Sequence, residues 1–184
     1  MIKKKILQID MDGVICDLEK KMLQLCPELG HIGAGPDWEE RSILFNKTAL
    51  ANPNLFRDLE PIEGAKEAID ILSEYFDIYF LSTPMWLVKE SYTDKALWLA
   101  EHFAHHAEDK LTLTKYKNLS KGDYLIDDTL RNGVPEFEGE HIHFGEGEFN
   151  DWEGVVNYLF QKEKIGFPQK VKDFILKKYQ FYKF

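Results

Sequence analysis

Five short apolar runs recur along the chain and end in polar residues. The first covers Ile6 to Ile9 and is followed at once by Asp10 and Asp12, with Gly13 behind them. Apolar runs of this length, bounded by turn residues, indicate buried β-strands. The pattern therefore predicts strands over residues 5–10, 77–82, 110–114, 123–127 and 141–144.

Segments with helical spacing separate these runs. Ala65, Ala68, Ile69 and Leu72 follow the i, i+3, i+4, i+7 pattern of an amphipathic helix, and similar stripes cover residues 92–103 and 155–159. Strands that alternate with helices predict an α/β fold in which a parallel sheet is covered on both faces. Residues 165–184 predict a terminal helix whose apolar face docks on the core or on a second subunit.

One region interrupts this alternation. Residues 17–60 carry helix-forming and polar residues with several Pro and Gly breakers, and no strand pattern. A mostly helical insertion after the first strand would stand over the strand ends as a cap. We therefore expect a core of residues 1–16 and 61–184 and a cap of residues 17–60. Packing in a small cap core is favoured over substrate contact for the large apolar residues Trp38, Phe45, Leu55 and Phe56.

Composition limits the classes of partner. The 184 residues are 44% hydrophobic and 30% charged, which is typical of a globular protein. The net charge of −9 argues against binding to nucleic-acid polymers or membrane surfaces. Two cysteines are too few for a disulfide scaffold or a thiolate zinc site. With no signal peptide and no apolar stretch of membrane-spanning length, we expect a cytoplasmic protein.

Chemically reactive side chains follow four of the predicted strands. Asp10 and Asp12 end the first, and the hydroxyl residues Ser82 and Thr83 end the second. Lys117 follows the third, and the pair Asp127 and Asp128 ends the fourth. In a parallel sheet these ends open on one edge, where α/β proteins bind ligands. Neighbouring acids repel unless a cation or a shared proton lies between them, and Mg²⁺ suits such oxygen ligands.

This set of groups is what phosphoryl transfer requires. A carboxylate can attack phosphorus and form an aspartyl phosphate, while a second carboxylic acid protonates the leaving alkoxide and later deprotonates water. A metal ion, a lysine and a hydroxyl stabilise the charge on the phosphate oxygens.

The ordered motifs resemble those of the haloacid dehalogenase-like phosphatases, and more narrowly those of the 5'(3')-deoxyribonucleotidases. The likeness runs over roughly residues 5–160 and includes Asp17 after the first motif and a Lys-x-x-Trp helix. The sequence stretches that carry it are Asp10-Met11-Asp12-Gly13-Val14, Asp58-Leu59-Glu60-Pro61-Ile62-Glu63-Gly64-Ala65, Ser82-Thr83-Pro84, Lys95 with Trp98, Leu113-Thr114-Lys115-Tyr116-Lys117 and Leu125-Ile126-Asp127-Asp128.

The resemblance implies a Rossmann-like core and a role for each matched residue. Asp10 would be the nucleophile and Asp12 the general acid and base. Mg²⁺ would be held by Asp10, by the backbone carbonyl of Asp12 and by Asp128, with Asp127 as a further ligand or directly behind. The phosphate would be bound by Ser82 and Lys117, assisted by Thr83 and Lys95.

The substrate is where alternatives stay open. The helical insertion would select a nucleoside, and Trp86 is the best candidate to stack on its base, but the insertion matches the family only at its C-terminal end. We expect a small phosphomonoester, most simply a deoxyribonucleoside monophosphate. A sugar phosphatase and a catalytically silent nucleotide sensor are the alternatives, and a homodimer is compatible with the sequence. A dehalogenase is disfavoured because it needs no acid at Asp12.

Overall fold

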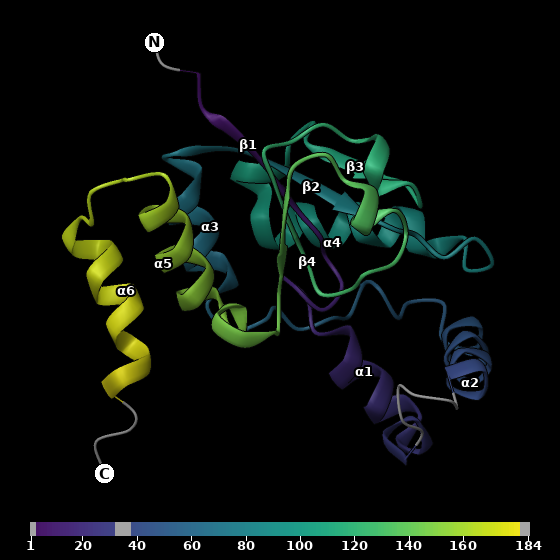
Figure 1. Ribbon diagram of the computed structural model, residues 1–184. Coiled ribbons are helices and arrows are strands. Elements are labelled where there is room, and N and C mark those ends of the chain that lie inside the picture. The colour runs from purple at the N-terminus through teal and green to yellow at the C-terminus, as the bar shows by residue number, and fades with distance from the viewer. Residues whose placement is uncertain (1–2, 32–37, 181–184) are drawn as a thin grey trace.

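The computed structural model describes residues 3–31 and 38–180 (Figure 1). The strands are β1 (Lys5–Ile9), β2 (Phe76–Ser82), β3 (Leu111–Leu113), β4 (Tyr124–Asp127) and β5 (Glu140–His143). The α-helices are α1 (Leu18–Leu25), α2 (Trp38–Ala51), α3 (Ala65–Ser73), α4 (Glu90–Ala107), α5 (Trp152–Lys162) and α6 (Gln169–Gln180). Short 3-10 helices are η1 (Pro27–His31), η2 (Lys117–Leu119), η3 (Val134–Glu136) and η4 (Gly147–Phe149).

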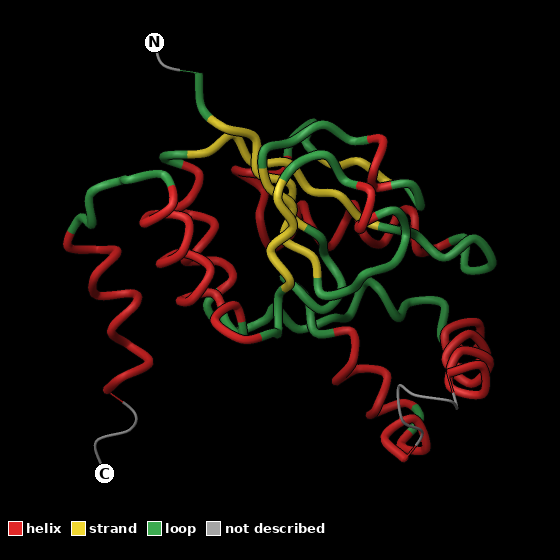
Figure 2. Tube along the Cα trace, in the orientation of Figure 1, coloured by secondary structure: helices red, strands yellow, loops and turns green. Residues whose placement is uncertain are grey.

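The five strands form one parallel sheet in the order β3-β2-β1-β4-β5 (Figure 2). The five predicted strands are confirmed, and their ends differ from the prediction by one residue at most. In the central strand, Ile9 pairs with Phe80 of β2 and with Ile126 of β4. From β1 the chain first adds β2 and β3 on one side of the sheet and then β4 and β5 on the other. The order of strands therefore switches between β1 and β4, which is the position where α/β sheets bind ligands. Asp10 and the Asp127–Asp128 pair leave the sheet at this position.

The two faces of the sheet are buried differently. Leu7, Ile9 and Ile126 belong to a large core cluster that includes side chains of α3, α4, α5 and α6. On the opposite face, Leu81 and Leu125 belong to a smaller cluster with side chains from the segment around η3. Because side chains alternate along a strand, one strand contributes to both clusters. This double burial explains why the strands appear in the sequence as apolar runs rather than as alternating patterns.

The C-terminal helix α6 docks on the core of its own chain. Val171 and Phe174 are buried, and α6 contacts α5 and α3 (Figure 1). The sequence left open whether this helix docks on the core or on a second subunit, and the structure shows that it docks on the core. None of the helices in the described residues is long and apolar enough to cross a membrane.

The 17–60 segment leaves and rejoins the core at adjacent points. The backbone N–H of Asp17 donates to the carbonyl of Glu60 at 2.8 Å, and Cys16 forms an antiparallel bridge with Pro61. The Asp17 side chain caps α1 by accepting from the N–H of Lys20. In Figure 1, α1 and α2 extend away from the sheet beyond the end of β1. The segment is helical as expected, and its role as a separate cap subdomain stays a prediction.

The large apolar residues of this segment have different environments. Leu55 and Phe56 are buried, as expected for a small core, whereas Phe45 is half-buried. Phe45 and Phe56 also line the cavity described below. The side chain of Trp38 lies outside the described residues.

Candidate active site

A tight turn after β1 places Asp10 and Asp12 at the floor of a cavity. The carbonyl of Met11 accepts the N–H groups of both Ile15 and Cys16, at 2.9 and 3.0 Å. Gly13 has φ +78, a left-handed conformation that favours glycine. A β-carbon on Gly13 would lie 2.3 Å from Oδ2 of Asp128, so the glycine also leaves room for that carboxyl group.

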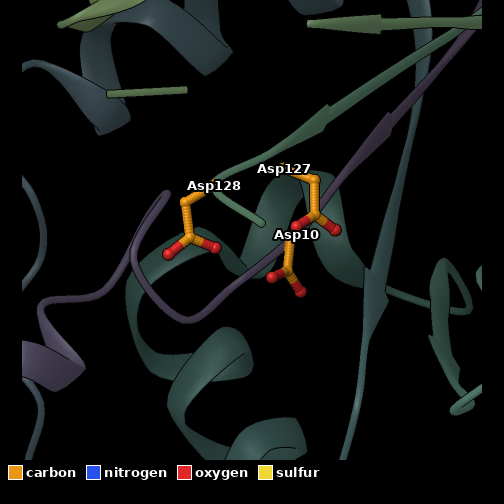
Figure 3. Close-up of side chains that lie close together, drawn as sticks. All are labelled: Asp10, Asp127 and Asp128. Atoms are coloured by element: carbon orange, nitrogen blue, oxygen red, sulfur yellow. The ribbon is translucent and has the colours of Figure 1, made fainter. Parts of the chain in front are cut away.

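Three carboxyl groups meet where β1 and β4 end. One oxygen from each of Asp10, Asp127 and Asp128 lies within 4.8 Å of the others, and Figure 3 shows the three side chains gathered there. Asp10 and Asp127 are buried, and Asp128 is half-buried. The predicted convergence of the first and fourth motifs is therefore present in the geometry.

Lys117 connects this cluster to the third strand. Its side chain is only 2% exposed, and its ammonium lies 3.0 Å from Oδ1 of Asp10 and forms an ion pair with Oδ2 of Asp127. The other oxygen of Asp127 accepts from the N–H and the hydroxyl of Thr129. Both oxygens of Asp127 thus contact protein groups, namely Lys117 on one side and Thr129 on the other.

Burial and like charges act together on the acids. Burial raises the pKa of Asp10 to about 6, although the ammonium of Lys117 opposes that rise. Burial also raises the pKa of Asp128 to about 7, and the charges of Asp10 and Asp127 add to the effect. The pKa of Lys117 is raised: burial lowers it, but the carboxylates of Asp10 and Asp127 outweigh the burial.

The donor set fits a hard divalent cation. The Oδ1 atom of Asp10 is buried, and the ammonium of Lys117 lies 3.0 Å from it. Burial and the neighbouring carboxylates raise the pKa values of Asp10 and Asp128, so a cation beside them would favour their ionised forms. Carboxylate oxygens held this close together are the ligands that Mg²⁺ takes in proteins.

Lys95 approaches the site from α4. Its side chain is 1% exposed, and Nζ donates to Oδ2 of Asp12 at 2.5 Å and to the hydroxyl of Ser82 at 3.1 Å. The ring of Phe56 lies 4.8 Å from the same nitrogen. Lys95 therefore joins the first and second motifs.

The two hydroxyl residues after β2 are not equivalent. Ser82 is fully buried beside Lys95, whereas Thr83 lines the cavity and donates its hydroxyl to the carbonyl of Thr114. The family resemblance implies that Ser82 binds the phosphate and Thr83 assists, but of the two it is Thr83 that lines the cavity.

The cavity has a volume of about 700 Å³ and lies between the strand ends and the 17–60 segment. Asp10, Asp12, Lys117 and Asp128 line it, and so does Trp86, which has 84% of its surface exposed. Its walls also include residues that the sequence did not single out for this purpose, namely Arg41, Asn46, Lys115, Arg131 and Asn132.

Some side chains that support the site belong to no sequence motif. Arg41 of α2 donates to the carbonyl of Leu29 and pairs with Glu19, so it ties α2 to the preceding helices. The Nε2 atoms of His141 and His143 in β5 lie 3.0 Å from the backbone carbonyl oxygens of Asp127 and Asp128, respectively. Only the three-dimensional structure shows which groups these side chains hold.

The parallel sheet and its strand order define a haloacid dehalogenase-like fold. The fold resembles that of a haloacid dehalogenase-like family hydrolase from Xanthomonas campestris with a TM-score of 0.52. That alignment covers 86% of this chain and 91% of the other at 14% sequence identity, so it concerns the fold alone.

Sequence comparison places the chain more narrowly. Residues 4–159 match the family described as 5' nucleotidase, deoxy (pyrimidine), cytosolic type C protein. A putative 5'(3')-deoxyribonucleotidase of Vibrio phage KVP40 is 38% identical over 161 residues, which cover 88% of each chain. The human 5'(3')-deoxyribonucleotidase of cytosolic type is 28% identical over 158 residues, covering 74% of this chain and 77% of the relative. The chain belongs to this nucleotidase family, as its motifs predicted, and is a phosphomonoester hydrolase.

Proposed function

We propose that this protein is a Mg²⁺-dependent 5'(3')-deoxyribonucleotidase that releases phosphate from deoxyribonucleoside monophosphates through an aspartyl phosphate. The observation that carries the proposal is the meeting of Asp10, Lys117 and Asp128 at the floor of one cavity of about 700 Å³. That volume lies in the range of small-molecule sites. The names of the relatives supply the class of substrate.

In the first half of the reaction, a carboxylate oxygen of Asp10 attacks phosphorus. An O–P bond forms to Asp10 while the bond from phosphorus to the nucleoside oxygen breaks, and protonated Asp12 gives its proton to that oxygen. The nucleoside leaves as a neutral alcohol. Asp12 lines the cavity beside Asp10, which is where this proton is needed.

In the second half, water attacks the same phosphorus atom. Asp12, now ionised, takes the proton of the water, and the bond between phosphorus and Asp10 breaks. Inorganic phosphate and the Asp10 carboxylate are released, and Asp12 is protonated again. Lys117 remains beside Asp10 in both halves and offsets negative charge on the phosphate oxygens.

Asp10, Asp128 and the backbone carbonyl of Asp12 would hold the metal ion. The ion would supply positive charge that lowers the repulsion between the Asp10 carboxylate and the phosphate. Asp127 lies directly behind, because Lys117 and Thr129 already occupy its oxygens.

We assign phosphate binding to Lys117, Thr83 and Ser82, of which Lys117 and Thr83 line the cavity. The apolar part of the cavity wall would take the nucleoside, with the base against Phe45, Phe56 or the exposed ring of Trp86. The 17–60 segment would then act as the cap that selects the substrate.

A phosphate-release screen tests this function. Purified protein is assayed on dUMP, dTMP, the corresponding 3'-monophosphates, ribonucleotides and sugar phosphates, each with Mg²⁺ and after chelation by EDTA. We expect the deoxyribonucleotides to be the best substrates, with activity lost on chelation and restored by Mg²⁺. The Asp10→Asn variant should fold and release no phosphate. Asp77→Asn, whose side chain lies by Lys110, is the matched control and should stay active.

Each failure of the screen has a distinct meaning. If sugar phosphates are hydrolysed faster than deoxyribonucleotides, the proposed substrate class is wrong, but the proposed mechanism is unaffected. Binding of dUMP without any turnover by the wild-type protein would indicate a silent nucleotide sensor. Unchanged turnover in Asp10→Asn would exclude the aspartyl phosphate, and full activity after thorough chelation would remove the metal ion.

We also expect a cytoplasmic location and allow for a homodimer. Fractionation of the native cells tests the first, and light scattering of the purified protein tests the second. A monomer at assay concentrations with full activity would exclude the dimer as a requirement.

A further inference from the structure

We propose that Lys95 is a positioning residue for the general acid Asp12 and does not bind the phosphate of the substrate. The inference rests on the proposed function, because it takes Asp12 as the group that protonates the leaving oxygen. It assigns to Lys95 a part different from the one that its place in the sequence motif suggested.

The contacts of the Lys95 ammonium are the first argument. An ammonium group has three N–H donors. One donates to Oδ2 of Asp12 at 2.5 Å and another to the hydroxyl of Ser82 at 3.1 Å. The ring of Phe56 lies 4.8 Å from Nζ, at cation–π distance. The protein itself therefore supplies acceptors for two of the three donors and an aromatic ring beside the charge.

Access to the cavity is the second argument. Asp12 and Phe56, which touch Lys95, line the cavity, whereas Lys95 is 1% exposed and is not among the described residues of the wall. Lys117, which is also buried, does reach the wall. The two lysines thus differ: Lys117 meets the cavity directly, and Lys95 meets it through Asp12.

The environment of the Asp12 carboxyl group is the third argument. Lys95 holds Oδ2, and the thiol of Cys16 lies 3.6 Å from Oδ1, so both oxygens have a neighbour that fixes the orientation of the group. Proton transfer requires a donor within hydrogen-bond reach of the leaving oxygen. A carboxyl group fixed in this way is already oriented before the substrate arrives. Loss of Lys95 should therefore damage the protonation step more than the binding of phosphate.

Two substrates with different leaving groups separate these effects. The alkoxide of a deoxynucleoside needs a proton as it leaves, whereas p-nitrophenolate is a stable anion near neutral pH and leaves without one. In the Lys95→Met variant, we expect the first-turnover release of nucleoside from dUMP to fall by about 10²-fold, the size of a general-acid contribution. The first-turnover burst of p-nitrophenol from p-nitrophenyl phosphate should keep its wild-type rate, although later turnovers slow because Asp12 also activates water.

A double-mutant cycle gives an independent test. If Lys95 acts through Asp12, then Lys95→Met should cost nothing more in an Asp12→Asn background, because the step that it supports is already lost. Lys95→Arg keeps the charge and should recover part of the dUMP rate. It also keeps the test decisive if the Met variant does not fold.

Asp94→Asn is the matched control for disturbance of α4. Asp94 precedes Lys95 and is also buried at 8% exposure, but it faces the charges of Arg57, Glu90 and Asp58. This variant should leave both first-turnover rates unchanged. A general structural effect would lower both rates in the control as well as in the Lys95 variants.

The outcomes that overturn the inference are specific. Equal losses of the nucleoside and p-nitrophenol bursts in both Lys95 variants, with multiplied losses in the Asp12→Asn background, would make Lys95 a phosphate ligand. A wild-type protein that does not hydrolyse dUMP would instead overturn the proposed function. The wild-type rates therefore distinguish the two failures.

Discussion

At the scale of single residues, the site contains two buried lysines that pair with different acids. Lys95 pairs with Asp12, and Lys117 pairs with Asp10 and Asp127. A buried charge that loses its partner is costly, because neither water nor another group solvates it. The arrangement therefore links the stability of the fold to the order of the acidic groups.

This link predicts the effect of removing the second lysine. Lys117→Met leaves Asp10 and Asp127 without their cation, so in EDTA above neutral pH the free energy of unfolding should fall by about 3–5 kcal/mol. Lys110→Met, which breaks the exposed ion pair with Asp77, should change it by less than about 1 kcal/mol. Urea denaturation of both variants measures the difference. Equal effects in the two variants would contradict the structural role of Lys117.

Gly13 allows a similar comparison. Gly13→Ala places a methyl group against Asp128 and also requires a positive φ, whereas Gly145→Ala requires the positive φ but meets no atom within 4 Å. In both variants the free energy of unfolding should fall by about 1–2 kcal/mol, because alanine is strained at a positive φ. Only Gly13→Ala should also weaken Mg²⁺ binding, by about tenfold or more. Isothermal titration with Mg²⁺ decides, and unchanged affinity in Gly13→Ala would show that Asp128 moves aside without consequence.

At the scale of elements, the sequence predicted most of the fold because burial leaves a simple pattern. Strands buried on both faces appear as apolar runs, and α3 shows the helical spacing of Ala65, Ala68, Ile69 and Leu72. The helix-forming residues of the segment with α1 and α2, and its lack of a strand pattern, predict that it is helical. Its arrangement over the strand ends comes from tertiary contacts such as that of Arg41 with Glu19, which no periodicity records.

The candidate site was predictable only in part. The carboxylates, Lys117 and the hydroxyl residues follow strands, so the parallel sheet brings them to one edge. Lys95 lies on a helix and its partner Asp12 is 83 positions away, so its spacing along α4 does not identify that partner. Ser82 is buried beside Lys95, whereas Thr83 lines the cavity and donates to the carbonyl of Thr114. This difference depends on tertiary packing, which the sequence does not reveal.

The terminal helix supports a prediction at this scale. Phe174 of α6 is buried, so Phe174→Ala should lower the free energy of unfolding by about 3–5 kcal/mol. Leu176 on the same helix is half exposed, and its replacement by Ala should change stability by no more than about 0.5 kcal/mol. Thermal or urea unfolding compares them. Equal stability of the two variants would mean that α6 does not contribute to the core in solution.

At the scale of the whole molecule, the acidic cluster makes stability depend on pH. Asp10 and Asp128 have pKa values of about 6 and about 7 in the folded chain, above the ordinary value of 3.8. Between about pH 4 and about pH 7, these two groups therefore bind more protons in the folded state than in the unfolded state. Because stability falls with pH wherever the folded state binds more protons, the contribution of these groups decreases as pH rises from about 4 to about 7.

A divalent cation should reverse this loss. Mg²⁺ binds the ionised carboxylates of the folded state, so its stabilisation, about 2.7 kcal/mol at a concentration of 100 times Kd, should be larger at about pH 8 than at about pH 5. Melting curves with Mg²⁺ or EDTA at both pH values measure the effect. Asp128→Asn should reduce it at the higher pH. A shift of equal size at both pH values would exclude linkage to these carboxyl groups.

The hydrogen bond between Asp17 and Glu60 has a consequence for the history of such proteins. Because the chain departs and returns at adjacent points of the backbone, a longer or shorter stretch can be accommodated there without moving the strands on either side. We expect that the segment can change what the enzyme recognises as long as the residue at position 56 keeps its contact with Lys95. We expect that grafting residues 17–60 from a relative would transfer substrate choice and leave the chemistry intact.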